Sequence, residues 1–407
     1  MTMTVSRRDL LYGLTVGACS STLGLPGLAN ARSALSIQRS DDEVRFPPID
    51  AHRLARRLVD AFEPATGERA LFVYDPTYYP ELALAVAEAL NAAGVYPVLT
   101  MTFEPPALAS LAGGGTAEAA RRAAAYVDFL KPTFERTDIF LWLAGRSNLS
   151  PGLRWERLID ASSARAIHNH WVLPPLGARS DAEIRQLIPM YERAILETDH
   201  AALSKAQDKC IAALRGEMIR VTSSDGSDLR VRVPANAWFH KSDGDISAAR
   251  ARRAVAVRDR EIEFPAGALR FIPDIASAEG RLVARVGEGG YLSEQITLDF
   301  KGGRVVSRRA ARNQAAFDAL WTRIGGDVDK IGEMVLGVNP LLVASLPSGE
   351  PPYYGYGAGA VRVSLGENWE SGGSLRSPGG PLWLFVPGAT LVAGRTAIVT
   401  NGTLERL

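Results

Sequence analysis

The chain contains few of the side chains that normally hold transition metals. Its 407 residues include two cysteines, Cys19 and Cys210, and five histidines, of which the last is His240. Zinc, iron and cobalt sites in proteins are built largely from thiolate and imidazole ligands. A metal bound wholly by the residues after His240 would therefore need an all-oxygen set of ligands, which suits calcium or magnesium better.

The chain also lacks an excess of charge of either sign. It has 46 basic and 45 acidic residues, a formal net charge of +1 at pH 7 and a hydrophobic fraction of 46%. These values are ordinary for a globular protein. Proteins that bind the phosphate backbone usually present a clustered excess of Lys and Arg, so we expect no nucleic-acid partner.

The N-terminal segment has an apolar run that is too short to span a membrane. Its apolar run, Leu10–Leu25, falls below the roughly 20 apolar residues that a spanning helix needs. The run follows the twin-arginine pattern Ser6-Arg7-Arg8-Asp9-Leu10 and precedes Ala29-Asn30-Ala31, a small-x-small cleavage site. Residues 1–31 therefore predict a twin-arginine signal peptide, and a periplasmic or secreted protein with no stable membrane span after cleavage. An alternative is a lipoprotein acylated at Cys19.

After a polar linker at residues 32–48, residues 49–215 are predicted to form an N-terminal α/β domain. Apolar runs predict strands buried on both faces at 70–74, 96–101 and 139–143. Segments of helical periodicity lie between or beside them, at 51–62, 80–94 and 117–130. Such alternation is typical of a doubly wound α/β domain.

The end of this domain is predicted to hold a strand with two histidines and two helices. Ala166–Val172 contains His168 and His170, which project to the same face of a strand because they are two residues apart. The helices are expected at 181–197 and 201–214, and the second should bury Cys210.

From residue 216 to residue 407 the pattern predicts a β-rich α+β C-terminal domain. Apolar and polar residues alternate at 218–222 and 229–233 around Asp225-Gly226, which favours a hairpin turn. Further strands are predicted at 282–286, 295–300 and 304–307, and a helix at 311–324. Since ligands commonly bind between domains, we expect a cleft between the two halves.

The stretch 331–384 contains a distinctive order of motifs. Gly332-Glu333, Gly337-Val338-Asn339-Pro340 and Arg362-Val363-Ser364-Leu365-Gly366 follow one another, and Phe264-Pro265-Ala266-Gly267 precedes them. This order resembles the C-terminal half of the aminopeptidase T-like metallopeptidases, a family that also contains iron-dependent dioxygenases of dihydroxypyridines. The resemblance implies an aminopeptidase T-like fold.

The residues that hold two metals in that family are largely replaced in this chain. Glu333 keeps the family's Gly-Glu, but Ala268 stands where the family has a ligand Glu, and Arg362 where it has a His. Trp369 aligns with a family Tyr. The family's His-x-Asp pair falls on Pro381 and Trp383. The resemblance therefore implies that the fold is kept and the metal site is lost, with no metal cofactor and no catalytic residue.

Our leading hypothesis is a protein that binds a peptide or a small carboxylated compound in the cleft. Arg362 would replace the charge of the metal, pairing with Glu333 and leaving donors for a ligand carboxylate. Aromatic side chains would supply flat walls, and Arg376 lies in a Gly/Ser-rich loop suited to an anion. The predicted ligand-binding residues are Glu333, Arg362, Glu367, Trp369, Arg376 and Tyr354. We expect a homodimer.

Three alternatives remain open from the sequence. The first is an active hydrolase whose relocated site uses His168, His170 and a carboxylate such as Glu367 or Glu370, or no metal at all. The second is a structural or assembly protein whose cleft is filled. In the third, the pairing of Arg362 with Glu333 is an ordinary buried salt bridge without a ligand.

Overall fold

The computed structural model describes residues 47–76, 78–102, 116–143, 154–170, 181–286, 295–345 and 355–407. The chain divides into two units, Met1–Arg45 and Phe46–Leu407, and all described residues belong to the second. The predicted signal peptide, Cys19 and Tyr354 lie outside the described residues.

Four strands from the first half of the chain and one later strand, β8, form a parallel sheet with the order β2-β1-β3-β4-β8. Its strands are β1 (Ala70–Tyr74), β2 (Val98–Thr102), β3 (Ile139–Leu143), β4 (Arg165–Asn169) and β8 (Glu261–Phe264). All four neighbouring pairs are parallel. The predicted strands at 70–74 and 139–143 are confirmed, because a continuous apolar run suits a strand covered on both faces.

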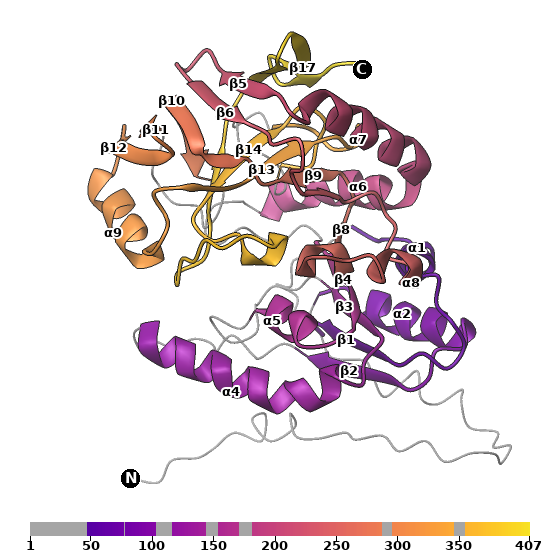
Figure 1. Ribbon diagram of the computed structural model, residues 1–407. Coiled ribbons are helices and arrows are strands. Elements are labelled where there is room, and N and C mark those ends of the chain that lie inside the picture. Colours follow the sequence, from indigo (N-terminus) through magenta and orange to yellow (C-terminus); the bar gives the residue numbers. More distant parts are fainter. Residues whose placement is uncertain are drawn as a thin grey trace, which may run out of the picture. The chain divides into compact units, whose positions relative to one another are not determined.

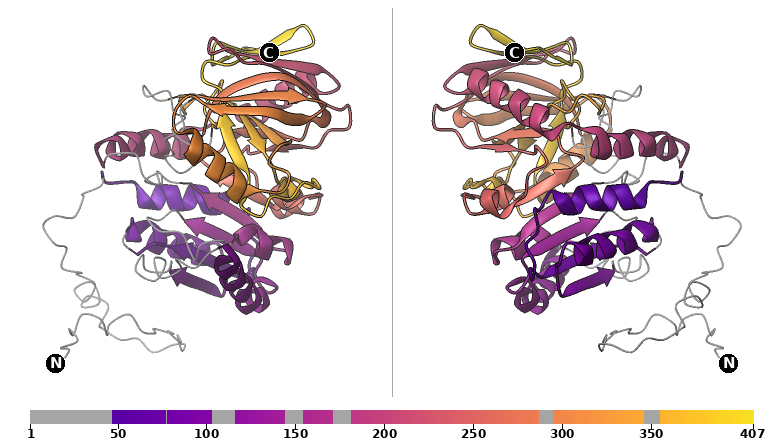
Figure 2. Two further views of the ribbon diagram at one scale, coloured as in Figure 1. Left: turned by 90° about the vertical axis from the view of Figure 1, so that its left-hand side faces the viewer. Right: turned by 90° about the vertical axis from the view of Figure 1, so that its right-hand side faces the viewer.

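Helices cover the two faces of this sheet (Figures 1 and 2). Alternate side chains of β1 point to opposite faces, so Phe72 packs with the helices on one side and Val73 with those on the other. One side has α1 (Ala51–Asp60), α2 (Pro80–Ala92) and α6 (Asp181–Glu197), and the other has α4 (Thr116–Phe134) and α5 (Trp155–Asp160).

The second half of the chain forms a sheet of 13 strands. Its main path runs β18-β17-β16-β5-β6-β10-β15-β14-β13-β9-β7, and β11 and β12 branch from β10. Every pair in it is antiparallel. The strands are β5 (Met218–Thr222), β6 (Asp228–Arg232), β7 (Phe239–Lys241), β9 (Ala268–Phe271), β10 (Asp274–Val286), β11 (Ile296–Lys301), β12 (Arg304–Ala310), β13 (Ile331–Gly337), β14 (Val361–Leu365), β15 (Leu382–Phe385), β16 (Thr390–Ala393), β17 (Thr396–Thr400) and β18 (Thr403–Leu404).

Further helices lie before or between the strands of the second half of the chain. They are α7 (His200–Leu214), α8 (Ala248–Ala251), α9 (Gln314–Ile324) and two 3-10 helices, η3 (Val257–Arg260) and η4 (Trp369–Ser371). As predicted, α7 buries Cys210. The predicted start of α9 at 311 is wrong, because Asn313 adopts a left-handed conformation with φ of 54° and the helix begins after it.

The strand predicted at 282–286 is much longer in the structure. It begins at Asp274, where β10 pairs with Arg232 of β6, and the register shifts between Asp274 and Glu279. A shift of register interrupts the alternation of apolar and polar residues. The sequence pattern therefore revealed only the last part of β10.

The two sheets are joined by a short connection between β8 and β9. Gly267 lies in it with a φ of 151°, and a side chain there would approach Asn339 to 2.6 Å. Only glycine fits such a close approach in this conformation. Because β8 belongs to the parallel sheet, that sheet takes its fifth strand from beyond the predicted boundary at Arg215.

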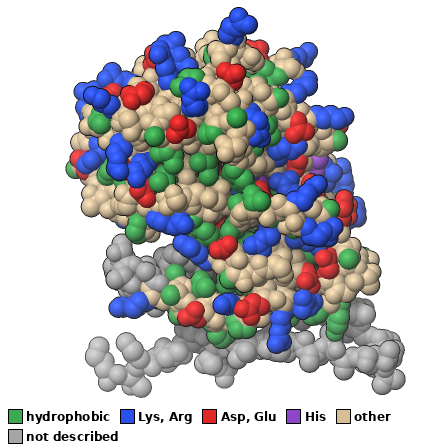
Figure 3. All heavy atoms as spheres, in the orientation of Figure 1, with side chains coloured by type: hydrophobic (Ala, Val, Ile, Leu, Met, Phe, Trp, Pro, Cys, Tyr) green, Lys and Arg blue, Asp and Glu red, His purple; other side chains and the backbone are tan. Residues whose placement is uncertain are grey.

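The surface carries both signs of charge. Basic and acidic side chains are interspersed over the face drawn in Figure 3, in keeping with the near-neutral composition. Within the described part of the chain, no helix is long and apolar enough to cross a membrane.

Candidate functional site

Glu333 on β13 is held by two arginines and a serine. Its Oε1 accepts hydrogen bonds from Arg270 Nη1 at 2.8 Å and from Arg362 Nη2 at 3.1 Å. Its Oε2 accepts one from Ser371 Oγ at 2.7 Å. The pairing of Arg362 with Glu333 that the sequence predicted is therefore present, but Arg270 shares the same oxygen.

The backbone at Glu333 is shaped by the glycine before it. The register of β13 against β14 shifts between Ile331 and Glu333. A side chain at Gly332 would lie 2.5 Å from the carbonyl oxygen of Gly366, so β14 could not approach there. The Gly-Glu motif thus brings the carboxylate of Glu333 beside the arginine of the neighbouring strand.

Arg362 is fully buried on β14, at 0% exposure. Its guanidinium lies 4.9 Å from the centre of the Trp383 ring, which places a cation over an aromatic face. Trp383 thus stabilises the positive charge of Arg362.

Arg270 on β9 connects Glu333 to a second carboxylate. Its Nη2 donates to Glu263 Oε1 and to the hydroxyl of Tyr356. Its guanidinium carbon lies 5.6 Å from the centre of the Tyr356 ring. Burial alone would raise the pKa of Glu263 and of Glu333. Burial is the largest single influence at both, but Arg270 acts together with Arg258 at Glu263 and with Arg362 and Ser371 at Glu333, and each carboxyl has a pKa below its ordinary value. Both are therefore ionised at neutral pH.

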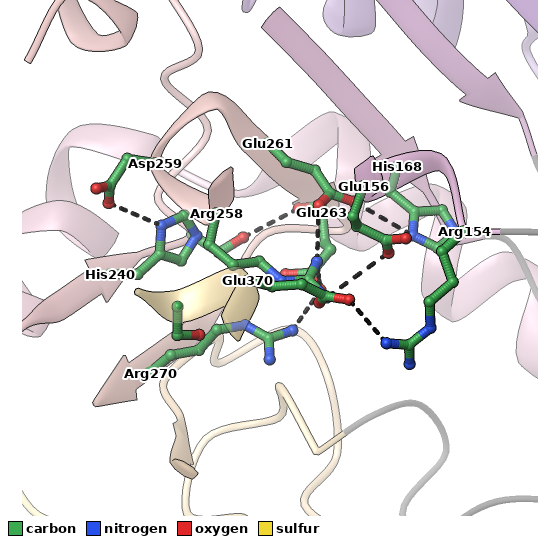
Figure 4. Close-up of polar contacts among 12 residues, drawn as sticks. Arg154, Glu156, His168, His240, Arg258, Asp259, Glu261, Glu263, Arg270 and Glu370 are labelled. Carbon is green, nitrogen blue, oxygen red and sulfur yellow. Dashed lines mark hydrogen bonds and ion pairs between the residues drawn. The ribbon is translucent and has the colours of Figure 1, made fainter. Parts of the chain in front are cut away.

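Arg258 on η3 extends the network of charges (Figure 4). Its Nη1 donates to Glu261 Oε2 at 2.9 Å and lies 3.5 Å from Glu263 Oε1. Its Nη2 donates to Glu370 and lies 3.8 Å from Glu156 Oε1. Glu263 thus bridges Arg258 and Arg270, and one guanidinium is shared among four carboxyl groups.

Two of these carboxyl groups have pKa values displaced upward. Burial raises the pKa of Glu261 well above its ordinary value and also raises that of Glu156. Neighbouring carboxylates, among them Glu370, add to both shifts, while Arg258 opposes them. The network therefore contains carboxyls whose pKa values are displaced in opposite directions.

Two predicted site residues lie at the edge of this network. Glu367 pairs with Arg154, which is also 3.4 Å from Glu370. Trp369 is 7% exposed, and the guanidinium of Arg157 lies 3.8 Å from its ring centre. These contacts bring η4 and the residues before it against α5.

Arg376 makes its described contacts within its own loop and with Asp327. Its Nη1 donates to the carbonyls of Gly373 and Leu375, and its backbone N–H donates to Asp327 Oδ2 at 2.8 Å. The residue is exposed. Its predicted role in holding an anion remains a prediction.

His168 on β4 and His170, which directly follows that strand, lie together. The rings of His168 and His170 have centroids 3.4 Å apart, and His168 stacks on Trp142 at 3.6 Å. Burial lowers the pKa of both histidines well below the ordinary value, so both are neutral at pH 7. The nearest carboxylate described for His168 is Glu261, at 3.7 Å from Nδ1. Glu370, suggested by the sequence as a further ligand, instead contacts Arg258 and Arg154.

A metal site finds little support among these side chains. No group of three or more His, Cys, Asp or Glu in the described ranges is arranged to hold a metal ion. Around Glu333 the nearest groups are two guanidiniums, whose positive charge repels a divalent cation. The residues present there do not fit the metals of the resembled family.

His240 on β7 forms a second feature that the sequence did not reveal. Its Nδ1 lies 3.7 Å from Asp259 Oδ1, and its ring stacks near Trp238 at 5.9 Å. Its Nε2 is buried without a hydrogen-bond partner in the described residues. Across the β7–β9 pair, His240 stands opposite Arg270.

The residues missed by the sequence share one signal. Glu261 and Glu263 lie in the short run Glu-Ile-Glu-Phe, and Arg270 lies in Ala-Leu-Arg-Phe. Both strands are buried at every position. A charged residue in such an apolar strand is costly unless it is paired, so these residues pointed to partners that only the fold identifies.

Comparisons with known proteins bear on the fold alone. No family model matches the chain, and no curated protein does. Among solved structures, a 2,5-dihydroxypyridine dioxygenase from Pseudomonas putida is similar with 16% identity and a TM-score of 0.56, covering 88% of this chain and 99% of that chain. Wild-type AmpT from Thermus thermophilus is similar with 15% identity and a TM-score of 0.57, over the same 88% and 99%. The predicted fold class is confirmed: the chain has an aminopeptidase T-like fold that combines a parallel α/β sheet with a large antiparallel sheet.

Proposed function

We propose that this chain is a non-metallo protein that binds a peptide or a small carboxylated compound at Arg270 and Arg362. The observation that carries the proposal is the hydrogen bonding of the two guanidiniums. They share one oxygen of Glu333, and the Nε–H of Arg270 is buried without an acceptor in the described residues. A buried donor of this kind is costly, and a ligand carboxylate would satisfy it.

The chemistry of the pair suits an anion better than a reaction. Arginine stays protonated at all ordinary pH values and forms strong, charge-assisted hydrogen bonds with carboxylates. It cannot lower the pKa of a bound water as a zinc ion does. The proposal is therefore binding without metal-assisted hydrolysis.

A thermal-shift experiment tests the proposal. Acetate, benzoate and the dipeptide Ala-Ala are added to the purified protein, and to an Arg362→Met variant in which an uncharged side chain of similar length replaces the arginine. A ligand that binds the folded state raises the melting temperature as its concentration exceeds the Kd. We expect benzoate or the dipeptide to raise that of the parent protein and to have a much smaller effect on the variant.

A matched control separates loss of binding from loss of stability. Arg281→Met removes an exposed arginine that pairs with Asp299 at 2.7 Å and makes no described contact with Glu333, Arg270 or Arg362. This variant should keep the full ligand-induced shift. Equal shifts in all three proteins would contradict the proposal and leave the contact of Arg362 with Glu333 as a structural salt bridge.

Elemental analysis of protein purified from its native compartment tests the absence of a metal. Zinc, iron or manganese in stoichiometric amount would overturn the proposal and favour the hydrolase alternative.

The same preparation tests export, which rests on the twin-arginine pattern in residues outside the described part of the chain. Changing Arg7 and Arg8 to Lys together should retain the protein in the cytoplasm. The homodimer stays a prediction, which sedimentation analysis would check.

A further inference from the structure

The charge network around the site contains more carboxyl groups than guanidiniums. We define the network as Arg154, Arg258, Arg270 and Arg362 with Glu156, Glu261, Glu263, Glu333, Glu367 and Glu370. Six carboxyls face four guanidiniums, so two negative charges would be uncompensated if all were ionised. Uncompensated buried charge is strongly unfavourable, and carboxyl groups avoid it by keeping their protons.

Among the described residues, no histidine supplies the missing positive charge, and Arg157, which acts on Glu370, is exposed to solvent that screens it. The histidine beside Glu261 is His168, which is neutral because burial lowers its pKa, and His170 is neutral for the same reason. His240 is also buried, which lowers its pKa, and it has Asp259 as its own acidic neighbour. Arg157 on α5 is exposed and stacks on Trp369.

The surplus acid is concentrated around one guanidinium. The guanidinium of Arg258 lies within 4 Å of four carboxyl groups, those of Glu156, Glu261, Glu263 and Glu370. Glu263 and Glu370 have a further arginine each, Arg270 and Arg154. Among its described contacts Glu156 has only Arg258, at 3.8 Å, and Glu261 has Arg258 and the neutral His168. The two protons therefore belong on Glu156 and Glu261.

We propose that Glu156 and Glu261 hold protons in the working protein, and that anion binding at Arg270 and Arg362 depends on those protons. The proposal rests on the proposed function, because it describes how the same site admits a ligand. An entering carboxylate adds one negative charge to a network that is neutral only while both carboxyls are protonated. The ligand class that follows is a monocarboxylate, because each further carboxylate would add another negative charge beside the buried carboxylates of the network.

Measuring benzoate affinity against pH tests the coupling. In the parent protein the Kd for benzoate should rise between pH 6 and pH 9, approaching about tenfold per pH unit for each proton that binding takes up. The double variant Glu156→Gln/Glu261→Gln carries neutral amides in place of the protonated acids. Its Kd should stay nearly constant over this range and match the low-pH value of the parent. Phthalate, with two carboxylates, should bind much more weakly than benzoate.

Glu279→Gln is the matched control, since it removes an exposed carboxyl outside the network and should leave the pH dependence unchanged. A parent protein that binds benzoate with the same Kd from pH 6 to pH 9 would refute the coupling while leaving the proposed function intact. Absence of benzoate binding at every pH would instead refute the proposed function for monocarboxylates, and the coupling with it.

A measurement without ligand decides where the protons are. If Glu261 is protonated at pH 6, Glu261→Gln replaces one neutral group by another, and the urea midpoint at pH 6 should be equal to that of the parent or higher. If Glu261 were ionised and paired with Arg258, the same change would break a buried ion pair and lower the midpoint at pH 6. The second result would overturn the proposed proton on Glu261 whether or not benzoate binds.

Discussion

Replacing Arg270 by methionine removes the cation that the two ionised carboxylates of the site share. Arg270 Nη1 lies 2.8 Å from Glu333 Oε1, and Nη2 donates to Glu263. At that distance, with an effective dielectric constant of about 20, the gross attraction of one pair is about 6 kcal/mol. Desolvation of the buried charges offsets much of it. Loss of Arg270 leaves Glu333 with Arg362 and Glu263 with Arg258 as their remaining cations, so we expect the free energy of unfolding to fall by about 3 kcal/mol at pH 7, the lower end of the cost of breaking a buried pair.

Urea denaturation followed by circular dichroism measures this change. A shift of the midpoint at constant m-value reports a change in stability rather than in the unfolded ensemble. Arg281→Met is the control, because its pair with Asp299 is solvent-exposed and such pairs contribute little.

The loss should also depend on pH in a stated direction. In the parent protein the pKa values of Glu263 and Glu333 are lowered, so their ionised forms contribute stability above the pKa of an unfolded Glu, about 4.3. Without Arg270 burial is opposed only by the remaining arginines, Arg258 at Glu263 and Arg362 at Glu333, so the pKa values of both carboxyls rise. The difference between parent and variant should therefore be largest near pH 7 and shrink toward pH 4. A variant no less stable than the Arg281→Met control, or a loss independent of pH, would refute this account of the site.

Three further predictions concern residues outside the network. Burial raises the pKa of Cys210 to about 11, so at pH 8 a thiol reagent should modify the native protein far more slowly than protein unfolded in urea. Asp199 caps α7 by accepting a hydrogen bond from the Ala202 N–H at 2.9 Å; Asp199→Ala should lower the free energy of unfolding by about 1 kcal/mol, and an unchanged urea midpoint would contradict the cap. Burial lowers the pKa of His200 to about 4, below the value of about 6.5 in an unfolded chain. As pH falls from 6.5 to 4 the unfolded state gains a proton that the folded state does not, so His200→Gln should flatten the acid loss of stability by up to about 3 kcal/mol; parallel stability curves would contradict it.

The local structure could be predicted from the sequence because its causes are local. An apolar run such as Ile139–Leu143 suits a strand covered on both faces, and the helical periodicity of Asp181–Glu197 marks a helix of those bounds. The irregular start of β10 was missed because a shift of register hides the alternation of apolar and polar residues by which a strand is predicted. Periodicity also does not specify which strands pair, so nothing indicated that β8 would join the parallel sheet.

The candidate site was predictable only where a motif survives. Gly332-Glu333 and the later Arg362 were found through a family resemblance, and their side chains do meet. Arg270 and Glu263 are not among the motifs quoted for the resemblance, and the pairing of Arg270 with Glu333 joins residues that are far apart along the chain. Their roles arise from the fold, which brings β8, β9 and β13 together around a few buried charges.

The course of the chain from β8 into β9 constrains how the protein is made. Strand β4 lacks its neighbour on one side until residues 261–264 have been synthesised, and this neighbour carries two of the buried carboxyls. Their arginines arrive before and after it, Arg258 from η3 and Arg270 from β9. A nascent chain released at Arg215 would expose an open sheet edge and no network, so the ribosome must deliver well over half of the polypeptide before the first layer can be finished.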